Sequence, residues 1–295
     1  MPIPGSGTLR VSCINAELGR TATTANSYFA GSSIPLPYSL FGLGNQFGVL
    51  NQSAPHSMSE WYGYNSVVTS CLLLYVNAAV PQSYAGSGTT WSDLSVNANN
   101  ATLINGPTYS SVCGGAITFD GVNDYGTFSN SIKGANTDSF TLSAFARVAS
   151  FNPSKGYVTI ARGFDQSGAY YEGWSMFLAF TGCGKAQLGI TTTSPSIASY
   201  TVTGSTTATA NNWYQLTGVW TAGSSLAVFM NGAFQACVSN TTTNLRNSTN
   251  GFVLGSVGVS AFYDTTIANA MAYNRALSGT EILQNYNALK GRFGL

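Results

Sequence analysis

Charged side chains are scarce in this sequence. Asp, Glu, Lys and Arg make up only 7% of its 295 residues, against about 25% in an ordinary soluble protein. With a formal net charge of +1, no polybasic surface exists to hold nucleic acid or anionic lipid by counterion release. A single histidine, His56, excludes a multi-histidine metal centre and would have to serve in any Ser-His-Asp triad.

Long apolar runs are also missing. The longest, residues 67–80, is interrupted by Thr69, Ser70 and Asn77, and a membrane-spanning helix needs about 20 apolar residues. The first ten residues, MPIPGSGTLR, have no basic segment followed by an apolar stretch. We therefore expect neither membrane insertion nor a secretory signal.

The five cysteines form no CxxC pair and no Cys/His spacing typical of a zinc site. Cys71 and Cys237 lie in the strings CLLLYV and FQACV, which have the pattern of strands. We expect free, mostly buried thiols in a protein made in a reducing compartment, with one disulfide as the alternative.

The residues that are abundant favour β-structure. Hydrophobic residues reach 44% and aromatic residues 13%, and much of the remainder is Gly, Ser, Thr and Asn. Asn231-Gly232 between two apolar runs is a strong hairpin signal. Apolar and polar residues alternate in several short segments, which predicts a β-sandwich: 140–146, 157–161, 174–180, 213–220 and 226–230.

The two ends of the chain differ from this pattern. Residues 1–66 are rich in Gly, Pro and Ser, with short helical signals only near 14–18 and 57–60. Such a segment buries little core by itself, so we expect a mostly irregular region that packs on another surface. At the other end, Ser278 and Glu281 have the spacing of a capping box before an apolar stripe, which predicts a short C-terminal helix.

Four strings in residues 67–295 resemble laminin G-like domains of the concanavalin A-like lectin/glucanase superfamily. They are WSDLS followed by NANNATL (91–103), FDGVNDY (119–125), NWYQL through VFMNG (212–232), and AYNRALS followed by EI (272–282). The resemblance implies an all-β fold, a concanavalin A-like jelly-roll sandwich. Val96, Ala98 and Ala101 replace glycines of the family's DLSGNGNNG turn, which puts any ligand contact of that turn in doubt.

A weaker resemblance concerns residues 1–66. RVSCINAELG (10–19) and SMSEWYG (57–63) are similar to a leader found in bacteriophage virion proteins and tail fibres. This implies a virion structural protein, assembled in the host cytoplasm, whose residues 1–66 attach or oligomerise while residues 67–295 display the sandwich. The expected partners are other virion proteins, further copies of the chain and host-surface glycan, in a tail appendage or a capsid decoration.

We expect no enzymatic activity. Glucanases on this fold use carboxylates that alternate along one strand and flank the glycosidic bond, and no such string occurs here. The alternatives are a free-standing carbohydrate-binding protein and a glycoside hydrolase that uses Glu172.

No cofactor is required on this interpretation, and Ca²⁺ is the one ion considered. The resemblance places a rim site at Asp120, Asp124 and Asp264, because Ca²⁺ takes six to eight oxygen ligands from carboxylates and carbonyls. The alternative is that these aspartates only make turn hydrogen bonds.

For glycan binding, the first candidates are Tyr170, Tyr171 and Trp174, an aromatic cluster near an expected loop. Sugars are bound by aromatic faces together with amide, hydroxyl and carboxylate groups. A core position for Trp174 is the alternative, since inward-facing residues must fill a sandwich. Trp91, Trp213 and Trp220 are expected to pack in the core or on a hairpin.

Overall fold

The computed structural model describes residues 67–128, 137–153, 157–164, 174–192, 198–245, 252–256 and 262–295. The chain divides into two compact units, Thr69–Ile282 on the one hand and Met1–Val68 with Leu283–Leu295 on the other. The helical signals near 14–18 and 57–60 lie outside the described residues. The domain boundary expected at 66/67 stays a prediction.

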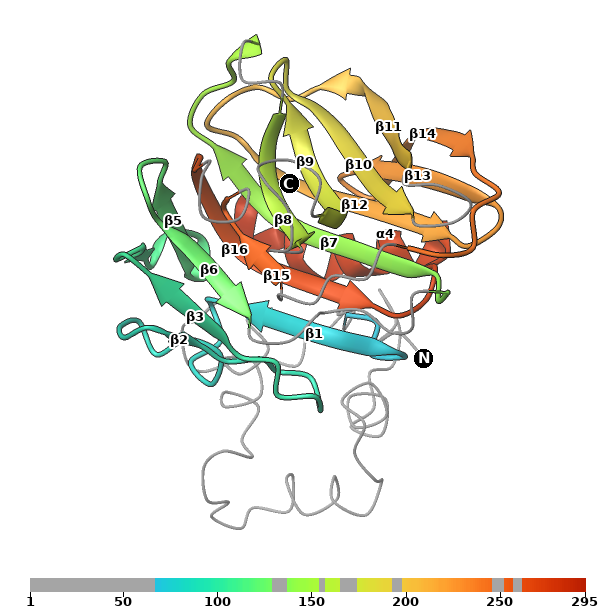
Figure 1. Cartoon of the computed structure of the whole chain (residues 1–295). Coiled ribbons are helices and arrows are strands. Elements are labelled where there is room, and N and C mark those ends of the chain that lie inside the picture. The colour runs from blue at the N-terminus through green and yellow to red at the C-terminus, as the bar shows by residue number, and fades with distance from the viewer. Residues whose placement is uncertain are drawn as a thin grey trace, which may run out of the picture. The chain divides into compact units, whose positions relative to one another are not determined.

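Two antiparallel sheets form the sandwich (Figure 1). Sheet A contains, in spatial order, β14 (Ala233–Ser239), β13 (Ser225–Met230), β12 (Trp213–Thr221), β7 (Phe140–Val148), β16 (Asp264–Tyr273), β5 (Ala116–Asp120) and β4 (Thr108–Ser110), and β1 (Leu72–Asn77) also pairs with β16. Sheet B contains β11 (Ala198–Thr207), β10 (Lys185–Thr192), β9 (Trp174–Thr181), β8 (Tyr157–Phe164), β15 (Phe252–Leu254), β6 (Tyr125–Phe128), β3 (Ala101–Ile104) and β2 (Thr90–Trp91). The expected all-β sandwich is confirmed.

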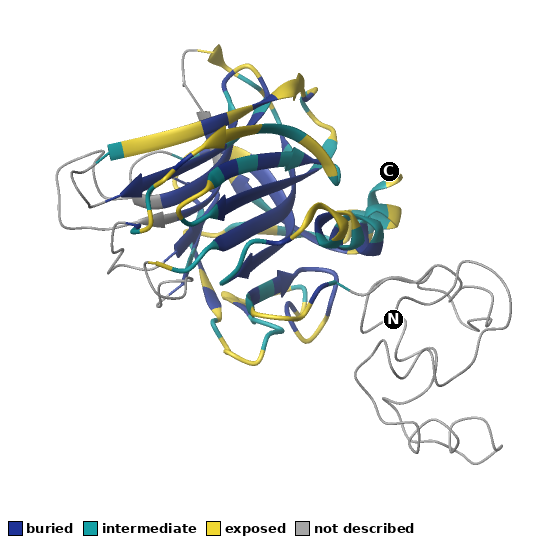
Figure 2. Ribbon diagram, turned by 90° about the vertical axis from the view of Figure 1, so that its right-hand side faces the viewer, coloured by how far each residue is buried: buried dark blue, intermediate teal, exposed yellow. Residues whose placement is uncertain are grey.

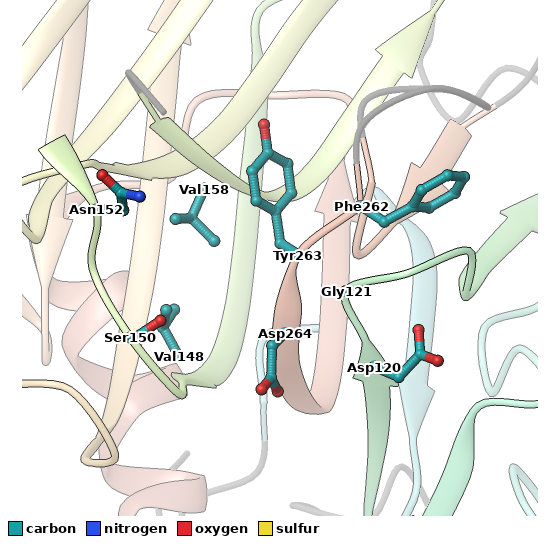
Figure 3. A pocket seen from close by; sticks show the side chains of 9 residues that line it. All are labelled: Asp120, Gly121, Val148, Ser150, Asn152, Val158, Phe262, Tyr263 and Asp264. Atoms are coloured by element: carbon teal, nitrogen blue, oxygen red, sulfur yellow. The ribbon is translucent and has the colours of Figure 1, made fainter. Parts of the chain in front are cut away.

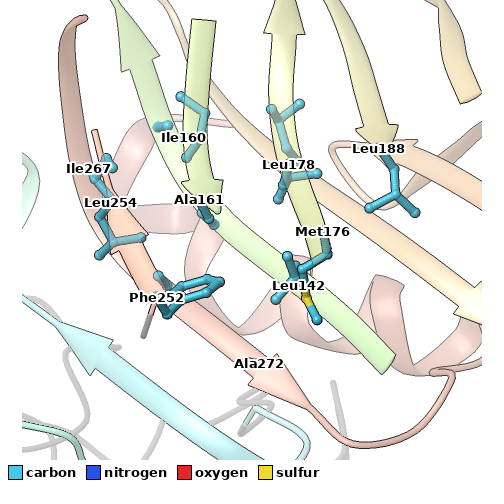
Figure 4. Packing of buried hydrophobic residues seen from close by; sticks show 14 of the residues in the cluster. Leu142, Ile160, Ala161, Met176, Leu178, Leu188, Phe252, Leu254, Ile267 and Ala272 are labelled. Atoms are coloured by element: carbon cyan, nitrogen blue, oxygen red, sulfur yellow. The ribbon is translucent and has the colours of Figure 1, made fainter. Parts of the chain in front are cut away.

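The core lies between the two sheets (Figure 4). Leu142 and Ala272 of sheet A face Leu178 and Leu188 of sheet B in one buried cluster. Trp91 and Trp220 are fully buried, as expected. Burial is concentrated in the central strands, and exposed residues collect along the outer strands and turns (Figure 2).

Two polar residues of β7, Thr141 and Ser143, are buried as well as the apolar ones. Thr141 Oγ1 donates to Arg275 O and accepts from Leu277 N, both at 2.9 Å. The hydroxyls of Ser143 and Thr217 lie 2.8 Å apart. Polar residues of the alternating segment, Thr141 and Ser143, therefore occupy buried, hydrogen-bonded positions in this strand, because a central strand is covered on both faces.

The hairpin and the helix form where local chemistry predicts them. Asn231 and Gly232, with φ of 52° and 74°, join β13 to β14 as the type I′ turn requires. Helix α4 (Gly279–Leu289) begins after Ser278, whose hydroxyl accepts from Glu281 N at 3.3 Å, while a Glu281 carboxylate oxygen accepts from Ser278 N at 2.9 Å. Both halves of the expected capping box are present.

The cysteine prediction is only half right. Cys71, Cys183 and Cys237 are free, but all three are exposed, and Cys113 is half-buried. Cys71 lies in the turn before β1 with a φ of 58° rather than inside the strand. Cys237 is on the edge strand β14, where one sheet neighbour leaves it open to solvent. The prediction of burial was therefore wrong.

Short 3₁₀ turns at Val112–Gly114 and Lys290–Phe293 complete the secondary structure. Among the described residues, no helix combines the length and the apolar character needed to cross a bilayer.

Candidate functional site

A pocket of about 250 Å³ opens at one rim of the sandwich (Figure 3). It lies where β5 and β7 end, where β8 begins, and where the chain enters β16. Its lining combines carboxylate, amide, hydroxyl and aromatic groups: Asp120, Gly121, Val148, Ser150, Asn152, Val158, Phe262, Tyr263 and Asp264.

Two aspartates line this pocket because of strand register. Asp264, the first residue of β16, pairs with Asp120, the last residue of β5. Directly paired residues of antiparallel strands point to the same face, with Cβ atoms about 4.5–5.5 Å apart. Both side chains are exposed. In Figure 3 the Asp264 carboxylate and the Tyr263 ring point in opposite directions, as consecutive residues entering a strand do.

A glycine allows the turn after Asp120 to pass close to Asp264. Gly121 has a φ of +74°, and a Cβ atom on it would lie 2.7 Å from the Asp264 backbone nitrogen. Only a residue without a side chain fits both the left-handed conformation and this approach. The Asp-Gly turn predicted from sequence therefore also shapes the pocket.

Asp120 and Asp124 have different electrostatic environments. Asp120 Oδ1 accepts from Val122 N at 2.8 Å and Asn123 N at 3.3 Å, and these backbone hydrogen bonds, chiefly the one from Val122, lower the pKa of Asp120. Asp124 is only 3% exposed, and its Oδ2 accepts from Asp120 N at 3.2 Å. Burial, with a further contribution from the Asp120 charge, raises the pKa of Asp124.

Aromatic and polar groups form the rest of the rim. Tyr263 is nearly buried at 8% exposure, and its backbone N donates to Gly255 O at 3.3 Å. The ring of Phe262 is half-buried and lies 6.1 Å from the ring of Tyr125, centroid to centroid. Ser150 and Asn152 are exposed. The pocket thus offers ring surface beside hydrogen-bonding groups.

The structure brings together two of the three predicted metal ligands. Asp120 and Asp264 line the pocket, whereas Asp124 is directed into the turn and does not line it. In the described part of the chain, no three His, Cys, Asp or Glu side chains are grouped closely enough to hold a metal ion by themselves. The calcium site stays a prediction, and an ion here would need backbone or solvent oxygens to complete its shell.

The predicted aromatic cluster falls outside the described region. Tyr170 and Tyr171 are not among the described residues, nor are Glu172 and His56, and for Trp174 only the backbone, which begins β9, is described. The structure therefore leaves the glycan prediction at these residues untested.

The pocket residues Phe262 and Tyr263 were missed by sequence reasoning. A Phe-Tyr-Asp string before a strand was the available signal, but aromatic residues are frequent throughout this sequence. Ser150 and Asn152 carried no signal at all, because only the tertiary fold places their loop beside Asp264.

The turn that follows Asp93, where the family pattern has three glycines that this chain replaces, has a structural role. Asp93 accepts four hydrogen bonds: Oδ1 from Tyr75 N and Ser95 N, both at 2.8 Å, and Oδ2 from Ser95 Oγ and Asn99 N, at 2.6 and 2.9 Å. Asn97 and Asn99 donate to Leu73 O. These bonds tie the turn to β1 and occupy both oxygens of its carboxylate.

A family model described as the concanavalin A-like lectin/glucanases superfamily matches residues 120–283. A search of the curated proteins finds no match. The matched segment is more than half of the chain, and both pocket carboxylates, Asp120 and Asp264, lie within it.

Solved structures resemble the chain in fold. The binding domain of Paraclostridial Mosquitocidal Protein 1 matches with a TM-score of 0.57 and 15% identity, over 75% of this chain and 52% of that one. The binding domain of botulinum neurotoxin serotype G gives 0.56 and 13%, over 73% and 50%. Trypanosoma rangeli sialidase gives 0.54 and 16%, over 81% and 36%.

At this identity the likeness shows the fold alone, and the chain spans about half the length of the two toxin domains. The sheet order and the family match indicate the same fold. The chain belongs to the concanavalin A-like lectin/glucanases superfamily and contains a lectin-like sandwich.

Proposed function

We propose that this chain is a non-catalytic carbohydrate-binding protein and that the rim pocket holds the sugar. One observation carries the proposal: two exposed aspartates, Asp120 and Asp264, line one pocket together with the aromatic residues Phe262 and Tyr263. Carboxylates accept hydrogen bonds from pairs of sugar hydroxyls, and a ring accepts the apolar face of a pyranose. The volume of about 250 Å³ is slightly below the usual range of about 300–1,000 Å³ for small-molecule pockets, which suits a single terminal sugar.

The electrostatics support binding over hydrolysis. A glycosidase needs one carboxyl group that stays protonated to act as acid, beside a second one that is ionised. The carboxyl group whose pKa is raised, Asp124, does not line the pocket, and Asp120, whose pKa is lowered, stays ionised. Neither Asp120 nor Asp124 is therefore suited to act as the acid of a glycosidase in this pocket.

Binding to a glycan array, followed by titration of the best ligand, tests this proposal. Asp264→Asn should weaken binding about 10- to 100-fold, because a hydrogen bond to a charged group contributes about 1.5–3 kcal/mol. Phe262→Ala should weaken it as well, and Val96→Ala, at a site 99% exposed in another turn, should not. Unchanged binding in both pocket variants, with loss in Trp174→Ala, would move the site to the 170–174 cluster.

Hydrolysis is tested on the same ligands. We expect no release of free sugar by the full chain after prolonged incubation. Release that is lost in Asp264→Asn or in Glu172→Gln would contradict the non-catalytic proposal and identify the carboxylate involved.

Calcium is a second ligand that this rim supports, because Asp120 and Asp264 are register partners on the same face. A ligand of the native state raises the melting temperature. We expect millimolar Ca²⁺ to raise the Tm of the full chain above its value in Mg²⁺ at equal ionic strength, and Asp264→Asn to remove the difference. Equal Tm values in the two ions would contradict a calcium site.

We propose further that the sandwich is displayed on a bacteriophage particle, with residues 1–66 as the attachment and oligomerisation region. The support is the resemblance of residues 10–19 and 57–63 to virion leaders. Mass spectrometry of purified particles tests it: hundreds of copies indicate capsid decoration, and a few copies indicate a tail appendage. Absence from the particles would leave a free-standing carbohydrate-binding protein.

A further inference from the structure

Sheet A has an outer face, which points away from the core between the two sheets. Successive side chains of a strand point to opposite faces, and Ala146, Val148 and Ile267 belong to the core. Arg147 of β7 and Thr266 of β16, which are register partners, therefore face outward. The strand ladders show which other side chains share this face with them.

One row of paired residues crosses the outer face near the rim pocket. Trp213 of β12 pairs with Arg147. Arg147 pairs with Thr266, which pairs in turn with Thr118 of β5. Directly paired residues of antiparallel strands lie side by side on one face. These four residues, which we call the outer row, place an indole ring, a guanidinium group and two hydroxyls on a single surface.

An aromatic ring holds the arginine of the outer row. The guanidinium carbon of Arg147 lies 5.7 Å from the centre of the Trp213 ring, within the range of a cation–π contact. Both side chains are half-buried. In the described part of the chain, no carboxylate or other acceptor is hydrogen-bonded to this guanidinium. Because the group carries five N–H donors in a planar fork, Arg147 can donate to two neighbouring hydroxyls of a ligand.

The two threonines of the outer row add acceptors. Thr118 Oγ1 and Thr266 Oγ1 lie 3.1 Å apart and share one hydrogen bond. A hydroxyl has one donor and two acceptor lone pairs, so this bond leaves acceptor capacity on both oxygens. Thr266 is buried, Thr118 is half-buried, and Thr108, the partner of Thr118 on β4, is exposed. A ligand can therefore reach the row from its Thr118 end.

Asp120 and Asp264 connect the outer row to the rim pocket. Asp264 precedes Thr266 by two residues on β16, and its partner Asp120 follows Thr118 by two residues on β5. Both aspartates therefore lie on the outer face, and in Figure 3 the Asp264 carboxylate points away from the Tyr263 ring. Two residues of a strand span about 6.6 Å. A ligand that extends from the pocket past Asp264 next meets the outer row.

We propose that the outer row is a second sugar subsite, so that the protein binds an oligosaccharide whose terminal sugar occupies the rim pocket and whose next sugar contacts Arg147 and Thr118. The occupant is the rest of the same glycan, because the row continues from the pocket through the two aspartates. Sugar hydroxyls both donate and accept, which matches the donors of Arg147 and the acceptors of Thr118 and Asp264. The inference rests on the proposed function, since the pocket holds the first sugar.

Affinity as a function of glycan length tests this subsite. Calorimetric titration of the full chain with the methyl glycosides of glucose, galactose, mannose and N-acetylglucosamine identifies the sugar that the pocket binds. Disaccharides with that sugar at the non-reducing end then measure the second subsite. We expect each matching disaccharide that reaches Arg147 to bind about 10-fold more tightly than the monosaccharide, as expected for a hydrogen bond to a charged group.

Substitutions of Arg147 test which residue provides the gain. Arg147→Gln should remove the gain and leave the monosaccharide affinity unchanged, because Arg147 does not line the rim pocket. Arg147→Lys should keep only part of it, since an ammonium group lacks the planar fork. Lys185→Gln removes a positive charge from a half-buried residue of β10, in sheet B, and is the matched control. It should bind both ligands as the wild type does.

The outcomes separate this inference from the proposed function. Equal affinities of the wild type for monosaccharide and disaccharide, or a gain that persists in Arg147→Gln, would overturn the second subsite while sugar binding in the pocket stands. A gain that is lost equally in Lys185→Gln would show an effect of net charge and would also overturn it. If the full chain binds neither ligand, the proposed function fails, and the second subsite fails with it.

Discussion

At the scale of single residues, Gly121 and Ala98 both have a positive φ, but only Ala98 carries a Cβ atom. Gly121 occupies its position without a side chain, in a turn that passes against Asp264. Ala98 occupies a left-handed conformation, with a φ of 52°, although it carries a Cβ. The first position is matched to its backbone, and the second is strained.

Gly121→Ala should destabilise the protein by about 1–3 kcal/mol, because the added methyl group meets the Asp264 backbone while φ stays positive. Urea unfolding monitored by tryptophan fluorescence measures the change. Gly88→Ala is the control for conformation alone, since its φ is also positive and nothing lies within 4 Å of its added Cβ. An equal loss in both variants would show that the contact with Asp264 contributes nothing.

Ala98→Gly should stabilise the protein by up to about 1 kcal/mol, because glycine adopts positive φ without steric cost. The free energy of unfolding of the full chain measures this effect. The same change at Ala101, inside β3, should instead be destabilising, since glycine weakens a strand. A destabilising Ala98→Gly would mean that the methyl group makes a contact worth more than the strain.

At the scale of elements, one ion pair links the end of β16 to the start of α4. The Arg275 guanidinium contacts both carboxylate oxygens of Glu281, at 2.7 and 3.0 Å, and donates from Nε to Ser70 O at 3.2 Å. The hydrogen bond from Arg275, together with those from Ser278, lowers the pKa of Glu281 from 4.5 to about 2. Glu281 thus serves the helix cap and the ion pair together.

This arrangement predicts a pH dependence. Because the pKa of Glu281 is lower in the folded state, its contribution is fully present above pH 4.5 and is lost as the pH falls towards 2. Both side chains are about a quarter to a third exposed, so solvent screening limits the contribution to about 1 kcal/mol. Glu281→Gln should lower the free energy of unfolding by that amount at pH 7 and by less than half of it at pH 3. An equal loss at both values would contradict an ionic contribution.

At the scale of the whole sandwich, the packing of the two sheets depends on a glycine in β12. A Cβ atom on Gly218 would lie 2.6 Å from Leu188 Cδ1, a core side chain of β10 in the facing sheet. Protein interiors are closely packed, so an added group must displace its neighbours. The spacing of the sheets is therefore set by a residue that has no side chain.

Gly218→Val should overpack this contact and destabilise the protein by about 1–3 kcal/mol. In a protein that already carries Leu188→Ala, Gly218→Val should destabilise less than it does in the wild type, because the removed side chain makes room. Thermal unfolding of the four proteins measures the coupling. Additive effects would show that the two residues do not compete for the same volume.

Sequence alone determined the features that depend on neighbouring residues. The Asn231-Gly232 hairpin, the Ser278 capping box and most strand positions follow from turn chemistry, capping and alternation, which act over a few residues. The motif resemblance added the concanavalin A-like type of sandwich, and it marked Asp120, Asp124 and Asp264 as residues of interest. Which face of a strand would meet solvent was less predictable, as the buried Thr141 and the exposed Cys237 illustrate.

Only the tertiary structure decided the pocket and the strand order of the sheets. Asp264 meets Asp120 through the pairing of β16 with β5, and Ser150 and Phe262 join them from loops that are distant in the sequence. Strand order in sheet A likewise leaves β14 at its margin. Pairing between strands far apart in the chain depends on the folding of the whole sandwich, and no local pattern specifies it.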